Sequence, residues 1–261
     1  MYENNPIFKA PKDENTKIWH YMDFTKFVSL LDTKALFFTR VDQLDDEFEG
    51  SITRFDLDPS FQKATSEERT DFLRHRMRMT EVYKWQREEL AVNCWHMNED
   101  ESAAMWKLYL KSDEGLVIQS TYQRLINSFD SHDSVNTIWV GVVNYGDYKT
   151  INIPVDEDTL YPFLYKQKWF DYERELRAVV VQKKTMSNVP KGQSWIGGSQ
   201  FLKMPKDGIK IPVNLDVMIE NIYTSPKSKD WFVELVKSIT KRFSLNNIPK
   251  LSSMTEKSTF V

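Results

Sequence analysis

The sequence predicts one α+β domain with a mixed, largely antiparallel sheet and surrounding helices. Its 261 residues are enough for a core that needs no disulfides, since a domain near this size buries about three quarters of its unfolded surface. Strand-like and helical segments follow one another without regular alternation, which argues against a doubly wound parallel sheet. The sequence also lacks the G-x-G-x-x-G and P-loop signatures. We expect a polar arm over residues 1–16, the domain over 17–255 and a polar tail over 256–261.

The first part of the domain is predicted to be strand, helix, strand, loop and long helix. Residues 17–22, KIWHYM, are typical of a strand, and Asp23 is placed to cap a helix with an apolar stripe at Phe24, Phe27, Val28 and Leu31. A second strand follows at 35–41. The acidic run 42–51 has no clear period and indicates a loop. Thr65 and Glu68 match a capping box, which predicts a helix from about 66 to 90.

The rest of the domain is also predicted to contain both strands and helices. Strands are expected at 91–97, 115–121, 138–148, 175–182, 208–213 and 221–225. Ser102 is a predicted cap for a helix, a short helical segment separates 115–121 from 138–148, and residues 159–169 are expected to be helical on either side of Pro162. Residues 183–208 are rich in Gly, Ser, Lys and Pro and indicate a loop. Pro226 suits the first turn of a last helix, whose stripe is Phe232, Leu235, Val236, Ile239 and Phe243.

Composition narrows the classes of function. The net charge of −3 argues against wholesale coating of nucleic acid, although a local basic patch stays open. The single cysteine, Cys94, excludes an intramolecular disulfide and a multi-cysteine zinc site. We see no secretion signal and no run of about 18 apolar residues that could span a bilayer. We therefore expect a cytoplasmic protein with no membrane partner.

The stretch KWFDYERELRAVVVQ, residues 168–182, carries the strongest chemical signal. Glu173, Glu175 and Arg177 occupy alternate positions, so in a strand they point to one face. One interpretation is a salt-bridged sheet edge. The other is a carboxylate at the mouth of a cleft beside Trp169, Phe170 and Tyr172. On the second interpretation Glu175 faces a ligand, and Arg177 anchors one carboxylate and holds the other in position.

Other candidate residues have weaker patterns. His20 lies between Trp19 and Tyr21, which could give a flat aromatic surface for a ligand. Cys94 and His96 share a strand phase, so a Cys–His nucleophile pair stays open. His96 and the acidic residues after it match no metal motif. The acidic cluster within 42–49 lacks EF-hand spacing, and we expect it to be exposed and structural, with no metal bound.

Several motifs together resemble the bacterial family known as domain of unknown function 2971. They are FFTRVDQLDDEFEGS, NCWHMNEDESAAMWKLYLKSDEGLVIQST, FDYERELRAVV and YTSPKSKDWF, in order over about residues 17–255. The family name implies no activity.

The order of the predicted elements is also similar in outline to ADP-ribosyltransferases of the His–Tyr–Glu type, nearest to the DNA-modifying toxins. The resemblance implies that His20 holds the adenosine ribose of NAD and that Thr39 lies near the nicotinamide. Glu175, with Glu173 as its rival, would bind the nicotinamide ribose and stabilise the transition state. Tyr109 and Tyr145 both compete for the role of the tyrosine.

The resulting hypothesis is an NAD-using, ADP-ribosyltransferase-like toxin or defence effector of a bacterium or phage. Its small-molecule partner would be NAD or a similar nucleotide, and its macromolecular target is not indicated. A non-catalytic nucleotide- or protein-binding module is the first alternative, and a metal-dependent nuclease built on the carboxylates is the second.

Overall fold

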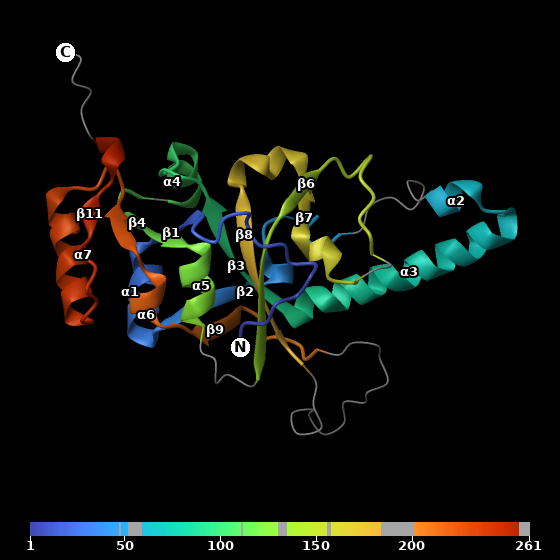
Figure 1. Ribbon diagram of the computed structural model, residues 1–261, viewed down its shortest axis with the longest axis horizontal. Helices are drawn as coiled ribbons and strands as arrows, with labels where there is room; N and C mark the ends of the chain where they lie inside the picture. The colour runs from blue at the N-terminus through green and yellow to red at the C-terminus, as the bar shows by residue number, and fades with distance from the viewer. Residues whose placement is uncertain are drawn as a thin grey trace, which may run out of the picture.

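The computed structural model describes residues 1–46, 48–51, 59–110, 112–129, 135–155, 158–183 and 201–255. It confirms the α+β class, with a nine-stranded, mostly antiparallel sheet flanked by helices (Figure 1). Most of the predicted loop 183–208 and the tail 256–261 lie outside the described residues, as do positions 52–58 of the chain.

The sheet branches at one central strand, β3 (Leu90–Met97). One edge of β3 pairs along its whole length with β8 (Glu175–Gln182), which in turn pairs with β5 (Asn136–Val142). The other edge is shared by two strands, β1 (Lys17–Asp23) and β2 (Ala35–Arg40). The sheet then continues outward to four more strands: β4 (Gly115–Thr121), β10 (Asn221–Thr224) and β11 (Lys250–Leu251) beyond β1, and β9 (Gly208–Pro212) beyond β2.

The two strands on that shared edge diverge. β1 pairs with β3 only at Ile18 and Trp19, opposite Met97 and His96. β2 pairs with β3 only at Thr39 and Arg40, opposite Val92 and Ala91. In the described sheet the edge of β3 between these two contacts, residues 93–95, therefore has neither β1 nor β2 as its ladder partner. We call this opening the fork.

The predicted helix starts are confirmed at three places. Asp23 accepts a hydrogen bond from the Lys26 amide at the start of α1 (Phe24–Thr33). Thr65 and Glu68 form the complete capping box of α3 (Ser66–Glu89). Ser102 caps α4 (Ala103–Tyr109). In each case a side-chain oxygen satisfies an amide that has no partner within the helix.

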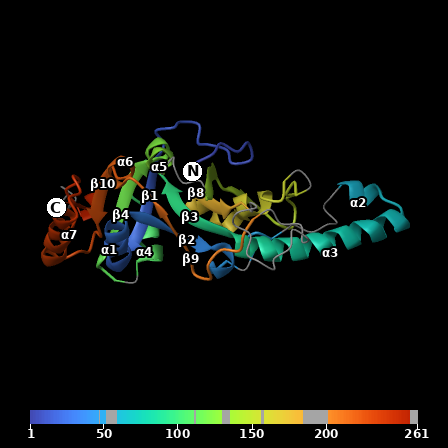
Figure 2. The same ribbon diagram turned by 90° about the horizontal axis from the view of Figure 1, so that it is seen from below.

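Apolar side chains form a core on each face of the sheet. One face is covered by α1, α5 (Tyr122–Ser128), α6 (Leu215–Met218) and α7 (Asp230–Arg242), which contribute buried residues to the larger core. On the other face, one core lies beneath the end of α3 and residues 148–155 and 158–164. A smaller core lies between α4 and the strands β1 and β4. The rest of α3 extends away from the body, with α2 (Pro59–Lys63) at its tip (Figures 1 and 2).

Four predictions about local structure were wrong. Residues 159–169 form a 3₁₀ segment, Tyr161–Leu164, and then strand β7 (Tyr165–Gln167), which pairs with β6 (Asn144–Gly146). The predicted strand 138–148 is thus two strands, β5 and β6. The last helix begins at Asp230, after a turn that contains Pro226. Glu173 ends a 3₁₀ segment, Lys168–Glu173, and is not in β8.

Candidate functional site

A pocket of about 350 Å³ lies at the fork, lined by residues of β1, β2 and the 93–95 edge of β3. Because the ladder is interrupted there, side chains from both faces of the sheet reach one cavity. Nine of the residues that the sequence singled out line it: Trp19, His20, Tyr21, Thr39, Cys94, His96, Tyr109, Glu173 and Glu175. Arg177 and Tyr145 do not line it but contact Glu175 from behind.

Glu175 is a buried carboxylate at the wall of the pocket. It is 3 % exposed, and Arg177 donates to both of its oxygens, from Nε at 2.6 Å and from Nη2 at 3.1 Å. Lys166 lies 3.5 Å from one oxygen. Burial would raise the pKa of Glu175, but the positive charge and hydrogen bonds of Arg177 outweigh it and lower that pKa to about 2. Glu175 is therefore ionised at neutral pH.

Arg177 itself is 1 % exposed and links Glu175 to a second carboxylate, that of Glu49. Its guanidinium forms an ion pair with Glu49 and donates to the Phe163 carbonyl at 2.7 Å. Glu49 is also 1 % exposed, so the prediction that the acidic loop is chiefly exposed and structural was wrong about exposure at this residue. The interpretation of residues 173–177 as a sheet edge was wrong too, because β8 lies between β3 and β5.

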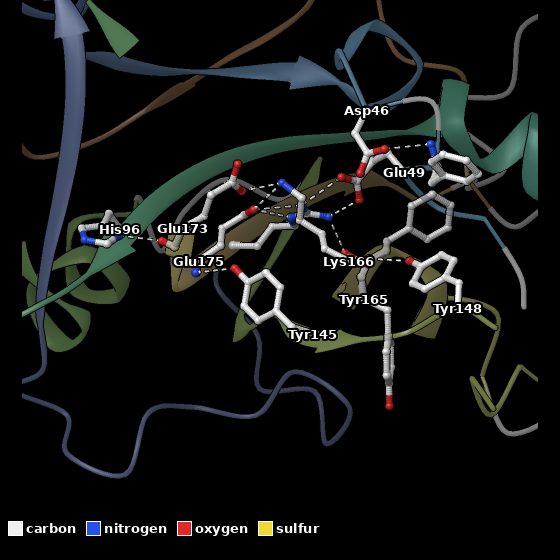
Figure 3. Close-up of polar contacts among 12 residues, drawn as sticks. Asp46, Glu49, His96, Tyr145, Tyr148, Tyr165, Lys166, Glu173 and Glu175 are labelled. Carbon is white, nitrogen blue, oxygen red and sulfur yellow. Dashed lines mark hydrogen bonds and ion pairs between the residues drawn. The ribbon is translucent and has the colours of Figure 1, made fainter. Parts of the chain in front are cut away.

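Glu173 reaches the same cluster by a different route from the predicted one. Arg174 has a left-handed backbone, with φ of 40°, which ends the 3₁₀ segment and breaks the strand alternation. Lys166 bridges Glu173, at 2.5 Å, and Glu175 (Figure 3). Burial raises the pKa of Glu173 despite the opposing charge of Lys166. Glu173 and Glu175 therefore share the ammonium group of Lys166, and their pKa values are shifted in opposite directions.

His20 reaches the pocket from the other face of the sheet. Its ring packs against Trp95, with centroids 4.9 Å apart, and its Nδ1–H donates to the Cys94 carbonyl at 2.9 Å. Trp95 belongs to the larger core, whereas its neighbour Cys94 packs against the core on the opposite face of the sheet. Burial lowers the pKa of His20 to about 4. The imidazole is thus neutral at pH 7, with Nε2 as its hydrogen-bond acceptor.

Cys94 and His96 both line the pocket but have separate partners. His96 donates from Nδ1 to the Glu173 carbonyl at 2.6 Å, and its buried Nε2 has no partner among the described residues. Burial raises the pKa of the Cys94 thiol well above its usual value, with the Glu175 charge acting in the same direction. A protonated thiol is a poor nucleophile, so this arrangement disfavours the Cys–His pair.

Two tyrosines named as alternatives take different positions. Tyr109 is half exposed at the pocket and stacks on Tyr21, with ring centroids 6.5 Å apart. Tyr145 lies behind the pocket, where its hydroxyl oxygen accepts the amide N–H of Glu175 at 2.8 Å (Figure 3). Tyr109 is therefore placed to touch a ligand, and Tyr145 is placed to fix the start of β8.

Sequence reasoning missed Lys166, which lies only a short way before Glu175 in the chain, and it treated Glu49 only as a member of the exposed acidic cluster. The partners of both residues depend on the fold, and no local pattern indicated them. It also missed two lysines that line the pocket, Lys26 on α1 and Lys210 on β9. The helical spacing of α1 could have placed Lys26 on the polar face beside the apolar stripe, but not beside a cavity.

Among the described residues, no group of three or more His, Cys, Asp and Glu side chains could hold a metal ion. Within the same part of the chain, no helix is both long and apolar enough to cross a membrane.

Comparisons with known proteins matched the chain to solved structures at low sequence identity. Neither a protein-family model nor a curated protein matches the chain, so the resemblance to the domain-of-unknown-function family stays a prediction. Among solved structures, the chain is similar to Thermus sp. 2.9 DarT in complex with NAD+, at 9 % identity and a TM-score of 0.41, covering 95 % of this chain and 100 % of that one. It is also similar to the same protein in complex with ADP-ribosylated ssDNA, at 9 % identity and a TM-score of 0.39, covering 94 % and 96 %. A likeness at this level establishes neither a shared fold nor a shared activity.

Proposed function

We propose that the pocket at the fork binds NAD and that the protein transfers ADP-ribose from it to an acceptor. The observation that carries this proposal is Glu175, an ionised carboxylate held by two cations on the wall of a pocket of ligand size. Cleavage of a glycosidic bond develops positive charge on the sugar, and a preorganised carboxylate stabilises that charge.

Glu175 and Arg177 suit the chemistry of NAD. When nicotinamide leaves with the bonding electrons of the C–N bond, positive charge remains on the ribose. Glu175 would face that charge and accept a hydrogen bond from a ribose hydroxyl, since Arg177 and Lys166 leave acceptor capacity on its two oxygens. Arg177 would keep the carboxylate ionised and correctly oriented.

Other pocket residues would bind and orient the nucleotide. The unprotonated Nε2 of His20 is an acceptor for a hydroxyl of the adenosine ribose. Thr39 offers a hydroxyl on the β2 side, and the half-exposed ring of Tyr109 offers a stacking surface for an aromatic base. Glu173, whose pKa is raised, would hold a proton more readily than Glu175 does.

A binding module without catalysis is the second candidate, and one observation favours it. Both oxygens of Glu175 already accept hydrogen bonds from Arg177, as in a structural ion pair. The nuclease alternative gains no such support, because Asp42 pairs with Arg40 and Glu49 pairs with Arg177.

The deciding experiment measures release of nicotinamide from NAD by the purified protein, with and without candidate protein and nucleic-acid acceptors. The wild type is compared with Glu175→Gln, which keeps the shape of the side chain and removes its charge. We expect Glu175→Gln to lose at least about 100-fold in rate, because the charge that opposes the developing cation is gone. Glu234→Gln, an exposed change on α7, is the matched control and should keep full activity.

The binding-module candidate predicts a different result. The wild type would then bind NAD, as seen by calorimetry, and release no nicotinamide with any acceptor. Equal activity of wild type and Glu175→Gln would contradict the role of Glu175 directly.

The cellular role that we propose is that of a cytoplasmic toxin or defence effector in a bacterium or phage. Expression of the wild type in bacteria should then arrest growth, and Glu175→Gln should relieve the arrest at equal protein level. Normal growth with active wild-type protein would contradict the toxin role without affecting the chemistry.

A further inference from the structure

The pocket carries charges of opposite sign on its two sides. The carboxylates Glu173 and Glu175 lie on the β8 side of β3. Lys26 of α1 and Lys210 of β9 also line the pocket, and β9 lies beyond β2 in the sheet. β8 and β9 are separated by β3 and β2, so about 14 Å lies between them at the usual spacing of three strand intervals.

The charges on these two sides differ in how they are neutralised. Glu175 has Arg177 and Lys166 as partners, and Glu173 has Lys166. Lys26 and Lys210, in contrast, have no ion pair with a carboxylate in the described parts of the chain. The pocket is thus lined by two ammonium groups that form no such ion pair in this part of the chain, and such groups favour an anionic ligand.

The lysines are linked through α1. Lys210 donates to the Ser29 hydroxyl at 3.4 Å, and Ser29 lies one turn beyond Lys26, on the same side of the helix. Lys26 is also close enough to His20 for its charge to help lower the pKa of that imidazole. The Asp23 carboxylate, the nearest acidic group along α1, accepts the Thr25 hydroxyl and the Lys26 amide on one oxygen. It is close enough to the Lys26 ammonium group for that charge to contribute to its lowered pKa, but the two form no ion pair.

Phe37 completes this side of the pocket. It lies directly opposite Lys210 in the β2–β9 ladder, lines the pocket and is 45 % exposed. An exposed aromatic ring beside an ammonium group suits a nucleotide, because the base can stack on the ring while the phosphate binds the ammonium group.

We infer that Lys26, Lys210 and Ser29 form a subsite for a diphosphate. The pocket would then be specific for ligands that carry a diphosphate at one end and, at the other end, a ring that is cationic or donates hydrogen bonds. The inference rests on the proposed function only for the identity of that ring. Lys26 and Lys210 would donate charge-assisted hydrogen bonds to phosphate oxygens, and Ser29 would donate its hydroxyl. The carboxylates would repel the same phosphates, which fixes the direction in which the ligand enters.

The test separates the two halves of the ligand. Binding of inorganic pyrophosphate, ADP-ribose and nicotinamide riboside is measured by calorimetry on the wild type and on Lys26→Ala/Lys210→Ala. Nicotinamide riboside has the cationic ring and no phosphate. We expect the double variant to lose about tenfold or more in affinity for pyrophosphate and ADP-ribose and to bind nicotinamide riboside as the wild type does. Added salt should weaken the first two ligands far more than the third.

The control removes two positive charges elsewhere. Lys107→Ala/Lys241→Ala changes exposed lysines that do not line the pocket, and it should leave all three affinities within about twofold. Equal loss in this control, or no loss in Lys26→Ala/Lys210→Ala, would overturn the subsite. Failure of pyrophosphate and ADP-ribose to bind the wild type would overturn it too. Binding of pyrophosphate without any release of nicotinamide from NAD would keep the subsite and overturn the proposed function. Comparison of the affinities for ADP-ribose and pyrophosphate shows whether the subsite prefers a nucleotide or free pyrophosphate.

Discussion

At the scale of single residues, Arg177 organises the buried charges of the protein. It contacts Glu175, Glu49 and the Phe163 carbonyl while almost fully buried. A buried ion pair adds little stability compared with apolar side chains of the same size, but removal of one partner leaves an uncompensated charge. The cluster is therefore sensitive to single substitutions at positions far apart in the sequence.

Glu49→Gln tests this sensitivity. Arg177 loses one of its two carboxylate partners, and we expect the free energy of unfolding to fall by about 3 kcal/mol. Urea denaturation measures the change. Glu99→Gln is the matched control, because its ion pair with Lys17 is exposed and worth at most about 1 kcal/mol. An equal, small effect in both variants would show that Arg177 does not depend on Glu49.

His20 predicts how stability depends on pH. Its pKa is about 4 in the folded protein and about 6.5 in the unfolded chain, so the unfolded state binds more protons between these values. The free energy of unfolding should therefore fall as the pH falls from 6.5 towards 4, on the order of 2–3 kcal/mol from this residue. The slope is best measured between pH 6.5 and 5, above the titration range of carboxylates with ordinary pKa values. The raised pKa values of Glu173 and Glu49 contribute with the opposite sign.

The comparison variant for that measurement is His20→Gln, which should flatten the slope. A smaller slope of the same sign should persist, because burial also lowers the pKa of His96. A slope that is identical in His20→Gln and wild type would contradict the assignment.

At the scale of secondary-structure elements, the strands at the fork and the helix α3 differ in how strongly they depend on contacts with the rest of the protein. β1 and β2 separate because each pairs with only one end of β3, and the pocket exists because of that separation. α3 has the opposite character, since it is mostly exposed over its first two thirds and extends beyond the body. Its start is stabilised chiefly by its own capping box and by contact with α2.

Two cap variants should therefore behave differently. Asp23→Ala removes the cap of α1, which packs into the main core, and should lower the free energy of global unfolding by about 1 kcal/mol. Thr65→Ala removes a cap of the same kind from α3, and we expect fraying of its first turn with little change in global stability. Hydrogen exchange of residues 66–69 and urea denaturation distinguish the two. Equal global losses would show that the start of α3 unfolds together with the core.

At the scale of the whole molecule, the N-terminal residues close the sheet. β5 pairs with β8 on one edge only, and residues 1–9 run along the other edge, with backbone hydrogen bonds to Ile138 and Val142. Phe8 is buried against Trp139. Gly141 permits this contact, since a Cβ there would lie 2.8 Å from the Phe8 backbone. An exposed strand edge is prone to pair with other molecules, so the segment protects the protein from association.

Gly141→Val should displace the N-terminal segment without removing it. We expect lower stability and concentration-dependent association, which light scattering and urea denaturation would record. Deletion of residues 1–9 should produce the same two effects. Gly146→Val is an informative comparison, because its Cβ would meet a flexible Ile151 side chain and not backbone. A Gly141→Val protein that stays monomeric and as stable as wild type would contradict this role of the segment.

Local patterns in the chain were sufficient to predict much of the fold. Apolar periodicity located most strands and the long helices, and the caps at Asp23, Thr65 and Ser102 were identified correctly, because caps depend on residues within one turn. The pairs that build the site could not be predicted in this way. Glu49 and Arg177 are 128 residues apart, and their contact depends on how distant segments pack.

The break before β8 shows the same limit within a short stretch. A strict strand phase would put Glu173 and Glu175 on one face, but the left-handed Arg174 ends the alternation, and Lys166 brings the two carboxylates together. His20 likewise shares a pocket with Glu175 because the sheet is open at the fork. Side-chain type and spacing are properties of the chain, whereas burial, charge pairing and the gap between β1 and β2 arise only when the strands pack.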